Sequence, residues 1–565
     1  MILSTLIFGL STALALASDP ELLAFTPQGI YLGTCNSTSA VESWLGIRYA
    51  QPPVTELRFR APQPLTRTFA GVQNASTFGN ACLQAPRAGL GAPIAEDCLF
   101  LNIWRPQNTP RDARLPVLVW FHGGRYTTGA GSDPAFNPSR ILQRSTEINK
   151  PIIFVTIYAG VMHTVQVRLW ALSHSNSRMN TFGFLATSLL PVEDLNAGLQ
   201  DQAEALRFLR ANIAAFGGGP SKVTLWGQVD VLRSLRLHFS KAGAGGVLAH
   251  IVHPQPGSAL FRAALANSET GPFKYSPPPE TYDAVDKPFR RLLDLTQCPF
   301  GPKALTYLRG LPSANASRTL LTPDPSVGQV WQPTISPSGS FAFERASVRI
   351  REVKFLKIPS LAGTVVSTSF ASPIRGHNLT GQAEDTAFTH FIRSALVDAT
   401  LLTPETISTI HHLYPANDTT LGGRFNTGDS LFDRAAAWYT DTMFPGPRRM
   451  LWEQAAERGQ RVWGFYYQEL SGNDRTRGIS HSSELPMFFG PVPSSTQLPF
   501  ANQLLDSYIT FVTHLNPGPA WPMYTKNKAN VLQLIQGNVA LIPDDFDQVK
   551  TDFLNSEGVL RQFQK

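Results

Sequence analysis

A glycine-rich turn follows directly on an apolar run that predicts a strand. The run is Leu115–Phe121, LPVLVWF, and the turn at 122–126 reads HGGRY. Glycine backbone at a strand end can aim N–H groups at one point, as stabilisation of an oxyanion requires. A plain strand-ending turn is the alternative. Gly129 and Gly131 keep the following loop small, which favours the functional interpretation.

One histidine lies in a loop late in the chain. His481 belongs to the segment 478–486, GISHSSELP, which follows the β-rich run 461–467, RVWGFYY. A loop histidine after a late strand suits a general base near neutral pH. A lone histidine is more often a surface residue, so the segment needs support from other motifs. The rival pair, His411 and His412, lies in a helix-like segment without a third ligand. We interpret that pair as part of a solvated face, and no metal site is predicted.

The stretch 198–249 predicts a helix, then a Gly/Pro stop at 217–220, and then a strand. The helix carries one apolar face, formed by Leu199, Ala203, Leu206, Leu209, Ile213 and Phe216. Lys222–Trp226 predicts a buried strand closing at Gly227. A strand ending in this way is the setting of a nucleophile elbow, in which G-x-S-x-G holds a serine on a tight turn. Here Gln228 is followed by Val229, and the small-residue run 242–246, AGAGG, comes only thirteen residues later.

Several apolar runs bounded by turn residues predict the interior of a parallel sheet. Besides 115–121 and 222–226, they are 151–157, PIIFVTI, and 461–467. Near-continuous apolar runs are typical of strands that are covered on both faces. Helical segments lie between them, so the order of elements indicates an open α/β sheet. No internal repeat, low-complexity tract or dividing linker is evident.

Composition describes an ordinary globular protein with a large core: 43% of the 565 residues are hydrophobic and 16% are charged. The formal charge of +7 comes from scattered basic residues without a long run of one sign, which disfavours nucleic-acid binding. The apolar N-terminus to residue 17 ends in Ala15-Leu16-Ala17 and predicts a secretory signal peptide. No later stretch is long enough to span a bilayer. We therefore expect a secreted, soluble mature protein.

Cysteine usage and glycosylation sequons fit the secretory route. Cys82 and Cys98 could close a loop worth about 3 kcal/mol in the chain-entropy model. The pairing of Cys35 and Cys298 is left open. N-x-S/T sequons occur at Asn36, Asn74, Asn315, Asn378 and Asn417.

Together these motifs resemble the type-B carboxylesterases, the family that holds fungal lipases and esterases, cholinesterases and the non-catalytic neuroligins. The resemblance covers nearly the whole mature chain, taken as one domain from 18 to 565. It rests on GIRYAQPPVTELRFRAP, EDCLFLNIW, FHGGRYTTGAG, FGFLAT, NAGLQDQAEALRFLRANIAAFGGGPSKVTLWG, GISHSSELPMFFG and WPMY. It implies an α/β-hydrolase fold, a large and mostly parallel sheet flanked by helices. The implied chemistry is Ser–His–Glu hydrolysis of a small-molecule or lipid ester without a cofactor.

The resemblance assigns roles to residues at matching positions. His481 matches the catalytic base, and Gly124, Arg125 and Ala242 match the donors of the oxyanion hole. Cys82 and Cys98 match the disulfide beside the mouth of the active site. The loop that this disulfide closes is too short for the long mobile lid of interfacially activated lipases.

Two members of the family's catalytic triad have no match. Val229 stands where the elbow serine belongs, and the nearest serine, Ser240, is followed by one residue too many for S-x-G. We keep Ser240 only as a weak candidate nucleophile. The family's acid loop has no carboxylate in GTVVSTSF at 363–370, and Glu384 and Asp385 come too late to replace it.

Two segments interrupt the family pattern, 158–175 and 229–241, and they contribute three of the seven net positive charges. Eighteen mixed residues directly after a central strand are hard to place in a packed sheet. We interpret both segments as non-native translation, for example of retained introns. A transcript that encodes both would contradict this hypothesis. The sequence therefore predicts a secreted esterase or lipase relative that is inactive as written. A non-catalytic binding protein on the same fold is the alternative.

Overall fold

The computed structural model describes residues 20–84, 89–123, 126, 129–157, 178–228, 243–255, 259–268, 275–312, 331–336, 339–365, 374, 376–418, 427–469, 479 and 482–565. The predicted signal peptide at 1–17 and the two interrupting segments, 158–175 and 229–241, lie outside these residues.

An eleven-stranded sheet forms the centre of the described structure, in the order β14-β13-β12-β11-β10-β9-β7-β8-β6-β4-β3. Pairing is parallel from β8 to β13 and antiparallel towards both edges. The strands are β3 (Thr34–Asn36), β4 (Val41–Arg48), β6 (Phe100–Pro106), β7 (Leu115–Phe121), β8 (Ile153–Ile157), β9 (Gly218–Gln228), β10 (Ala263–Asn267), β11 (Ser360–Val365), β12 (Val462–Tyr467), β13 (Asn530–Leu534) and β14 (Ala540–Pro543). The predicted mostly parallel sheet is thus confirmed.

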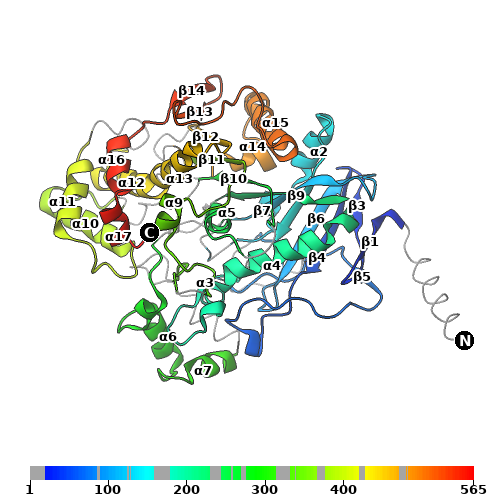
Figure 1. Ribbon diagram of the computed structural model, residues 1–565, viewed down its shortest axis with the longest axis horizontal. Coiled ribbons are helices and arrows are strands. Elements are labelled where there is room, and N and C mark those ends of the chain that lie inside the picture. The colour runs from blue at the N-terminus through cyan, green and yellow to red at the C-terminus, as the bar shows by residue number, and fades with distance from the viewer. Residues whose placement is uncertain are drawn as a thin grey trace, which may run out of the picture.

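A second, three-stranded sheet contains β1 (Leu23–Thr26), β2 (Gly29–Leu32) and β5 (Val72–Asn74). Helices surround the large sheet, and α10, α11, α12, α16 and α17 gather at the end of the molecule opposite β1 and β5 (Figure 1). The α-helices are α2 (Ser139–Glu147), α3 (Asn180–Phe184), α4 (Ala197–Asn212), α5 (Gly243–Val252), α6 (Pro288–Thr296), α7 (Ala304–Gly310), α9 (Ala346–Arg351), α10 (Gly381–Ser394), α11 (Pro404–Leu413), α12 (Ser430–Met443), α13 (Pro445–Glu457), α14 (Leu485–Phe489), α15 (Leu498–His514), α16 (Gln548–Leu554) and α17 (Glu557–Gln562). Short 3-10 turns are η1 (Pro20–Leu22), η2 (Thr55–Leu57), η3 (Pro134–Phe136), η4 (Val192–Asp194), η5 (Ile213–Phe216), η6 (Pro279–Asp283) and η10 (Ser495–Gln497).

The central strands are apolar on both faces because helices cover both. Every residue of β8, β10, β11 and β12 is buried. Side chains alternate between the two faces of a strand. Trp226 on β9 therefore packs against Phe488 and Phe489 of α14 and Tyr508 of α15. The next residue, Gly227, instead contacts the first turn of α5.

The helix that precedes β9 follows the predicted periodicity. All six residues of its predicted apolar face are buried, over α4 and η5. Gly217 ends η5 with a φ of +84°, a conformation that glycine adopts without a Cβ penalty. The predicted stop at 217–220 is too long, because Gly218 already pairs with Leu115 and begins β9.

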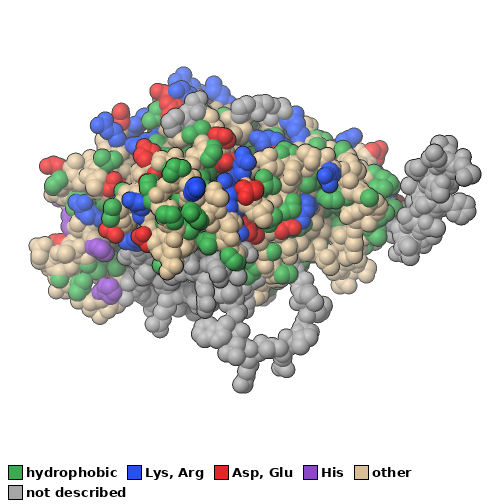
Figure 2. Space-filling view, turned by 90° about the horizontal axis from the view of Figure 1, so that it is seen from below, with side chains coloured by type: hydrophobic (Ala, Val, Ile, Leu, Met, Phe, Trp, Pro, Cys, Tyr) green, Lys and Arg blue, Asp and Glu red, His purple; other side chains and the backbone are tan. Residues whose placement is uncertain are grey.

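Charges of both signs are interspersed with hydrophobic side chains over the face shown in Figure 2. No continuous surface of one charge is visible on that face. Within the described residues, none of the helices has both the length and the apolar character needed to cross a bilayer.

Candidate active site

Two glycines that match the ends of the predicted elbow motif come together where β9 meets α5, and they form a tightly packed backbone frame. A Cβ placed on Gly227 would lie 2.3 Å from the carbonyl carbon of Gly243 and 2.7 Å from the backbone nitrogen of Ala244. A Cβ on Gly243 would lie 2.4 Å from the carbonyl oxygen of Gln228. Only glycine permits such close backbone contact. Residues on either side of the segment 229–242 are therefore direct neighbours.

A buried polar network lies beside this frame, at the ends of β9 and β10. The Gln228 side chain donates a hydrogen bond to Glu484 Oε1, and Asn267 donates to the same oxygen at 3.3 Å. Asn267 Oδ1 in turn accepts from the Trp226 indole at 3.0 Å and from the Tyr508 hydroxyl at 2.8 Å. Glu484 is 1% exposed. A buried carboxylate is tolerated when hydrogen-bond donors converge on it.

Glu484 also affects the pKa of two neighbouring tyrosine side chains. Burial, followed by the charge of Glu484, raises the pKa of Tyr467 and of Tyr508 well above the usual value. Both hydroxyls therefore remain protonated at neutral pH, and that of Tyr508 donates to Asn267. Glu484 lies at the N-terminus of α14 and three residues after His481 in the sequence. The network thus ties the segment that follows His481 to the heads of β9 and β10.

Ser268 follows β10 in a strained conformation. Its φ is +57°, its side chain is fully buried, and its hydroxyl has no hydrogen-bond partner among the described residues. Its N–H donates to the carbonyl of Gly363 on β11 at 2.8 Å. In the parallel register Asn267 pairs with Gln228, so Ser268 directly follows the last paired residue of β10. Strain and an unsatisfied polar group at a sheet head are features of functional sites.

The turn after β7 packs tightly onto a second turn. A Cβ on Gly129, whose φ is +117°, would lie 2.3 Å from the Gly123 carbonyl oxygen and 2.5 Å from His122 Nδ1. The carbonyl of Gly131 accepts a hydrogen bond from the Thr156 hydroxyl of β8 at 3.1 Å. The prediction that these glycines keep the loop small and close-fitting is confirmed for the described residues.

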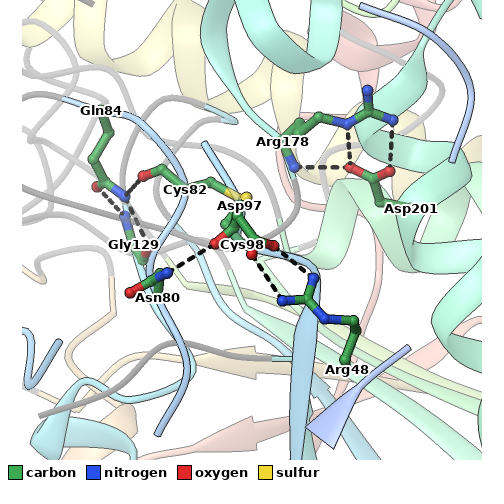
Figure 3. Close-up of a disulfide and its surroundings, with 9 residues drawn as sticks. All are labelled: Arg48, Asn80, Cys82, Gln84, Asp97, Cys98, Gly129, Arg178 and Asp201. Carbon is green, nitrogen blue, oxygen red and sulfur yellow. Dashed lines mark hydrogen bonds and ion pairs between the residues drawn. A yellow bond between two sulfur atoms is a disulfide. The ribbon is translucent and has the colours of Figure 1, made fainter. Parts of the chain in front are cut away.

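Cys82 and Cys98 form a disulfide bond with their Cα atoms 5.0 Å apart, as the resemblance implies. The loop that it closes reaches the second turn through Gln84 (Figure 3). Beside Cys98, Asp97 forms a double ion pair with Arg48 at 2.5 and 2.8 Å.

A further ion pair fixes the chain after the first interrupting segment. Arg178 binds Asp201 of α4 through its guanidinium, at 3.1 and 2.8 Å, and through its backbone N–H at 2.9 Å (Figure 3). Asp201 is fully buried. Breaking one partner of such a pair is costly because it strands a buried charge.

All of the predicted catalytic and oxyanion-hole residues, His481, Ser240, Gly124, Arg125 and Ala242, lie outside the described residues. The sequon asparagine Asn315 also lies outside them. The other four sequon asparagines, Asn36, Asn74, Asn378 and Asn417, are exposed. The residues that would follow β11 as the acid loop, 366–373, also lie outside the described residues.

Other titratable groups are engaged elsewhere. Burial lowers the pKa of His250 and of His253 on and after α5 to about 3, so both imidazoles are neutral at pH 7. Glu384 and Asp385 on α10 bind Arg434 of α12, at 3.3 and 2.7 Å. Both carboxylates are therefore engaged by the same guanidinium.

The predicted solvated face is correct for one member of the histidine pair. His412 is exposed. The prediction is wrong for His411, which is half-buried and contacts Asp385 at 3.2 Å and the Thr389 hydroxyl at 2.9 Å. Helix α10 packs over this residue, which a periodicity argument on α11 alone does not reveal.

Sequence reasoning missed the roles of Glu484, Asn267, Ser268 and Gln84. The spacing H-S-S-E from His481 to Glu484 is a local signal that could have indicated a buried carboxylate near the base. Asn267 and Ser268 carry a weaker signal, as polar residues at the end of the apolar run 263–266, AALA. Gln84 has no local signal beyond its place two residues after Cys82.

Comparison with known proteins agrees with this geometry. The family model described as "Carboxylesterase family" matches residues 22–553. "Secreted lipase 1" of Botryotinia fuckeliana is 27% identical over 592 residues, 95% of this chain and 93% of that protein. "Inactive carboxylesterase-like protein VdtD" of Byssochlamys spectabilis is 33% identical over 259 residues, 42% and 41% of the two chains. The crystal structure of Aspergillus niger EstA superimposes with a TM-score of 0.76 at 24% identity, covering 96% of this chain and 99% of EstA.

The chain therefore belongs to the carboxylesterase family and has the α/β-hydrolase fold.

Proposed function

We propose that this chain is a secreted carboxylesterase-family protein whose fold suits hydrolysis of carboxylic esters but which, with this sequence, does not hydrolyse them. One observation carries the proposal. Gly227 and Gln228 directly contact Gly243, so the elbow frame is present, yet the residue after Gln228 is Val229. Valine has no nucleophilic atom with which to form an acyl-enzyme.

With a serine in the elbow, the remaining parts have clear roles. His481 would take the serine proton, and the N–H groups of Gly124, Arg125 and Ala242 would bind the oxyanion. Each such donor contributes about 3 kcal/mol to the transition state. Loss of the nucleophile alone reduces turnover by about 10⁶-fold in a comparable triad. The missing carboxylate in 363–370 removes the group that would orient His481.

A fluorophosphonate serine probe tests the proposal directly. We expect no labelling of the purified chain. Stoichiometric labelling that Ser240→Ala abolishes would show that Ser240 acts as the nucleophile and would overturn the proposal. Sequencing the transcript tests the related hypothesis that 158–175 and 229–241 are non-native.

A restored variant gives the sharper comparison. Replacing residues 229–241 by one serine joins Gly227-Gln228 to Ala242-Gly243 through a complete elbow. Because the two ends already touch, the shortened chain has little distance to close. We expect this variant to react with the probe, and a matched variant with alanine in place of that serine to remain unlabelled.

A non-catalytic binding protein is the second candidate. It is favoured by the likeness to VdtD, which its name describes as an inactive carboxylesterase-like protein. Medium-chain p-nitrophenyl esters distinguish binding alone from residual catalysis. Quenching of tryptophan fluorescence without release of p-nitrophenol supports binding alone. Release of p-nitrophenol that is lost in Ser240→Ala supports residual catalysis.

We also propose that the protein is secreted and glycosylated. Secretion and glycosylation are supported by the apolar N-terminus, by the buried disulfide, by four exposed sequon asparagines and by the likeness to a protein named secreted lipase 1. Expression in a secreting fungal host should place the protein in the medium. An N-glycosidase should then lower its apparent mass, and Asn378→Gln should remove one glycan if that site is used.

A further inference from the structure

We propose that Gln84 is a positioning residue that couples the loop closed by Cys82 and Cys98 to the turn at His122 and Gly123. This inference concerns the backbone of the turn. It holds whether or not the chain binds or hydrolyses an ester, so its failure is distinguishable from failure of the proposed function.

The C-terminal end of the disulfide loop is firmly anchored. Asp97 pairs with Arg48, and Glu96 forms a second double ion pair with Arg58, at 2.5 and 2.8 Å. The Arg58 guanidinium also donates to the carbonyls of Leu308 and Leu311. Cys98, the next residue, is 1% exposed. Bidentate pairs of this kind fix orientation as well as distance.

The N-terminal end of the loop is held against its own later residues. Ala81 forms an isolated bridge with Ile94, donates to the Pro93 carbonyl at 2.8 Å, and accepts from Ala95 at 2.8 Å. The disulfide between Cys82 and Cys98 then closes the loop. Both ends therefore form one rigid base from which Gln84 projects.

The Gln84 side chain both accepts a hydrogen bond from the backbone of Gly129 and donates one to it. Its Oε1 accepts from the Gly129 N–H at 3.1 Å, and its Nε2 donates to the Gly129 carbonyl at 3.4 Å. Its Nε2 also contacts the Cys82 carbonyl at 3.3 Å. Figure 3 shows Gln84 reaching from beside the disulfide to Gly129. Because Gln84 is 2% exposed, water cannot easily replace these hydrogen bonds.

Movement of Gly129 must be transmitted to the turn after β7. A Cβ on Gly129 would overlap both the Gly123 carbonyl and the His122 ring, so no free space separates the two turns. His122 Nδ1 lies 2.8 Å from the Gly123 carbonyl oxygen. Packed neighbours without free space pass a displacement on.

A second contact joins the same loop to the same turn farther along. Ser132 donates to the Leu90 carbonyl at 2.6 Å, and Leu90 forms a small apolar cluster with Ala81 and Ala130. This contact holds the far side of the 129–132 turn. Gln84 holds the side that touches Gly123, which makes Gln84, and not Ser132, the coupling residue.

Hydrogen exchange measured by mass spectrometry tests the coupling. Gln84→Met preserves side-chain length and removes both hydrogen bonds to Gly129. We expect amide exchange in the peptide covering 119–132 to rise about tenfold, because two buried backbone groups lose their partners. Exchange in the β12 peptide, 461–468, should stay unchanged. Gln51→Met removes an exposed side-chain hydrogen bond, to the Pro64 carbonyl at 3.1 Å, and is the control with the same change of residue type and no expected effect on the turn.

Combining variants distinguishes a positioning role of Gln84 from a general loss of stability, because effects on hydrogen exchange that act through the same contact do not add. The variant Cys82→Ala/Cys98→Ala should raise exchange of the same 119–132 peptide, and adding Gln84→Met should produce little further increase. Additive increases, or equal increases in the 119–132 and β12 peptides, would overturn the proposal. If the cysteine variant does not fold, Gln84→Met compared with Ser132→Ala decides. Only Gln84→Met should increase exchange at Gly123, and an equal effect of both would overturn the proposal.

Discussion

Gly227 at the end of β9 and Gly243 at the start of α5 are in direct backbone contact, although fourteen residues separate Gln228 from Gly243 in the chain. The contact leaves no room for a side chain on either residue. These are the two glycines that match the first and last positions of the predicted elbow motif.

Gly227→Ala should therefore destabilise the protein. The added Cβ would lie 2.3 Å from Gly243 and must displace either β9 or α5. Overpacking of this kind costs about 1–3 kcal/mol. Urea unfolding followed by tryptophan fluorescence measures the loss.

The matched control is Gly558→Ala in helix α17, where an added Cβ would meet no atom within 4 Å. There we expect a gain of about 0.5–1 kcal/mol from helix propensity. Equal effects of the two substitutions would contradict the packing argument.

The bond between Gln228 and Glu484 should be worth more than a neutral hydrogen bond. Gln228→Met removes one donor from a buried carboxylate, which costs about 1.5–3 kcal/mol. In a Glu484→Gln background the same substitution should cost only about 0.5–1.5 kcal/mol, because the acceptor is then neutral. Unfolding free energies of the four proteins in this cycle provide the test. An identical cost in both backgrounds would show that the charge of Glu484 is unimportant.

Local patterns predicted some elements closely and others only in part. Leu115–Phe121 is β7 with the predicted bounds, because a continuous apolar run between turn residues has few alternatives. Lys222–Trp226 underestimates β9, which extends to Gly218 because that glycine pairs with Leu115. The pairing of strands depends on both partners, so the local sequence of one strand does not determine where the pairing begins.

The polar network was beyond a sequence argument for the same reason. Gln228 and Glu484 are 256 residues apart in the chain, and no local sequence pattern around either residue predicts their contact. Family motifs assign roles to His481 and to the glycine-rich turn, but they could not indicate that Gln84 binds Gly129. Such contacts depend on how loops fold back on the sheet, which local periodicity does not encode.

Ser268→Gly should stabilise the fold slightly. Ser268 has a φ of +57° and a buried hydroxyl to which no residue in the described part of the chain forms a hydrogen bond. The left-handed conformation costs a non-glycine residue about 1–2 kcal/mol, and the entropy lost by glycine on folding offsets about 0.5–1 kcal/mol of that gain. Ser268→Ala keeps the strain and removes only the hydroxyl, so its unfolding free energy should stay close to the parent value. A marked loss of stability in both variants would show that the hydroxyl is satisfied in solution.

Lys565→Met should remove a pH dependence of stability. Burial lowers the pKa of Lys565 from 10.5 to about 7. Its Nζ donates to the Thr442 carbonyl and lies over the ring of Tyr275. Tyr275 stays neutral because burial raises its own pKa. Between pH 7 and 10.5 the unfolded chain binds a proton that the folded chain lacks, so the unfolding free energy rises with pH in this window and falls as the pH decreases towards 7. The contribution has a slope of up to about 1.4 kcal/mol per pH unit.

Urea unfolding at pH 7, 8 and 9 tests this pH dependence. The unfolding free energy of Lys565→Met should exceed that of the parent by an amount that shrinks as the pH rises. The exposed Lys528→Met should run parallel to the parent at all three values. A constant difference between Lys565→Met and the parent would mean that Lys565 keeps its ordinary pKa in the folded protein.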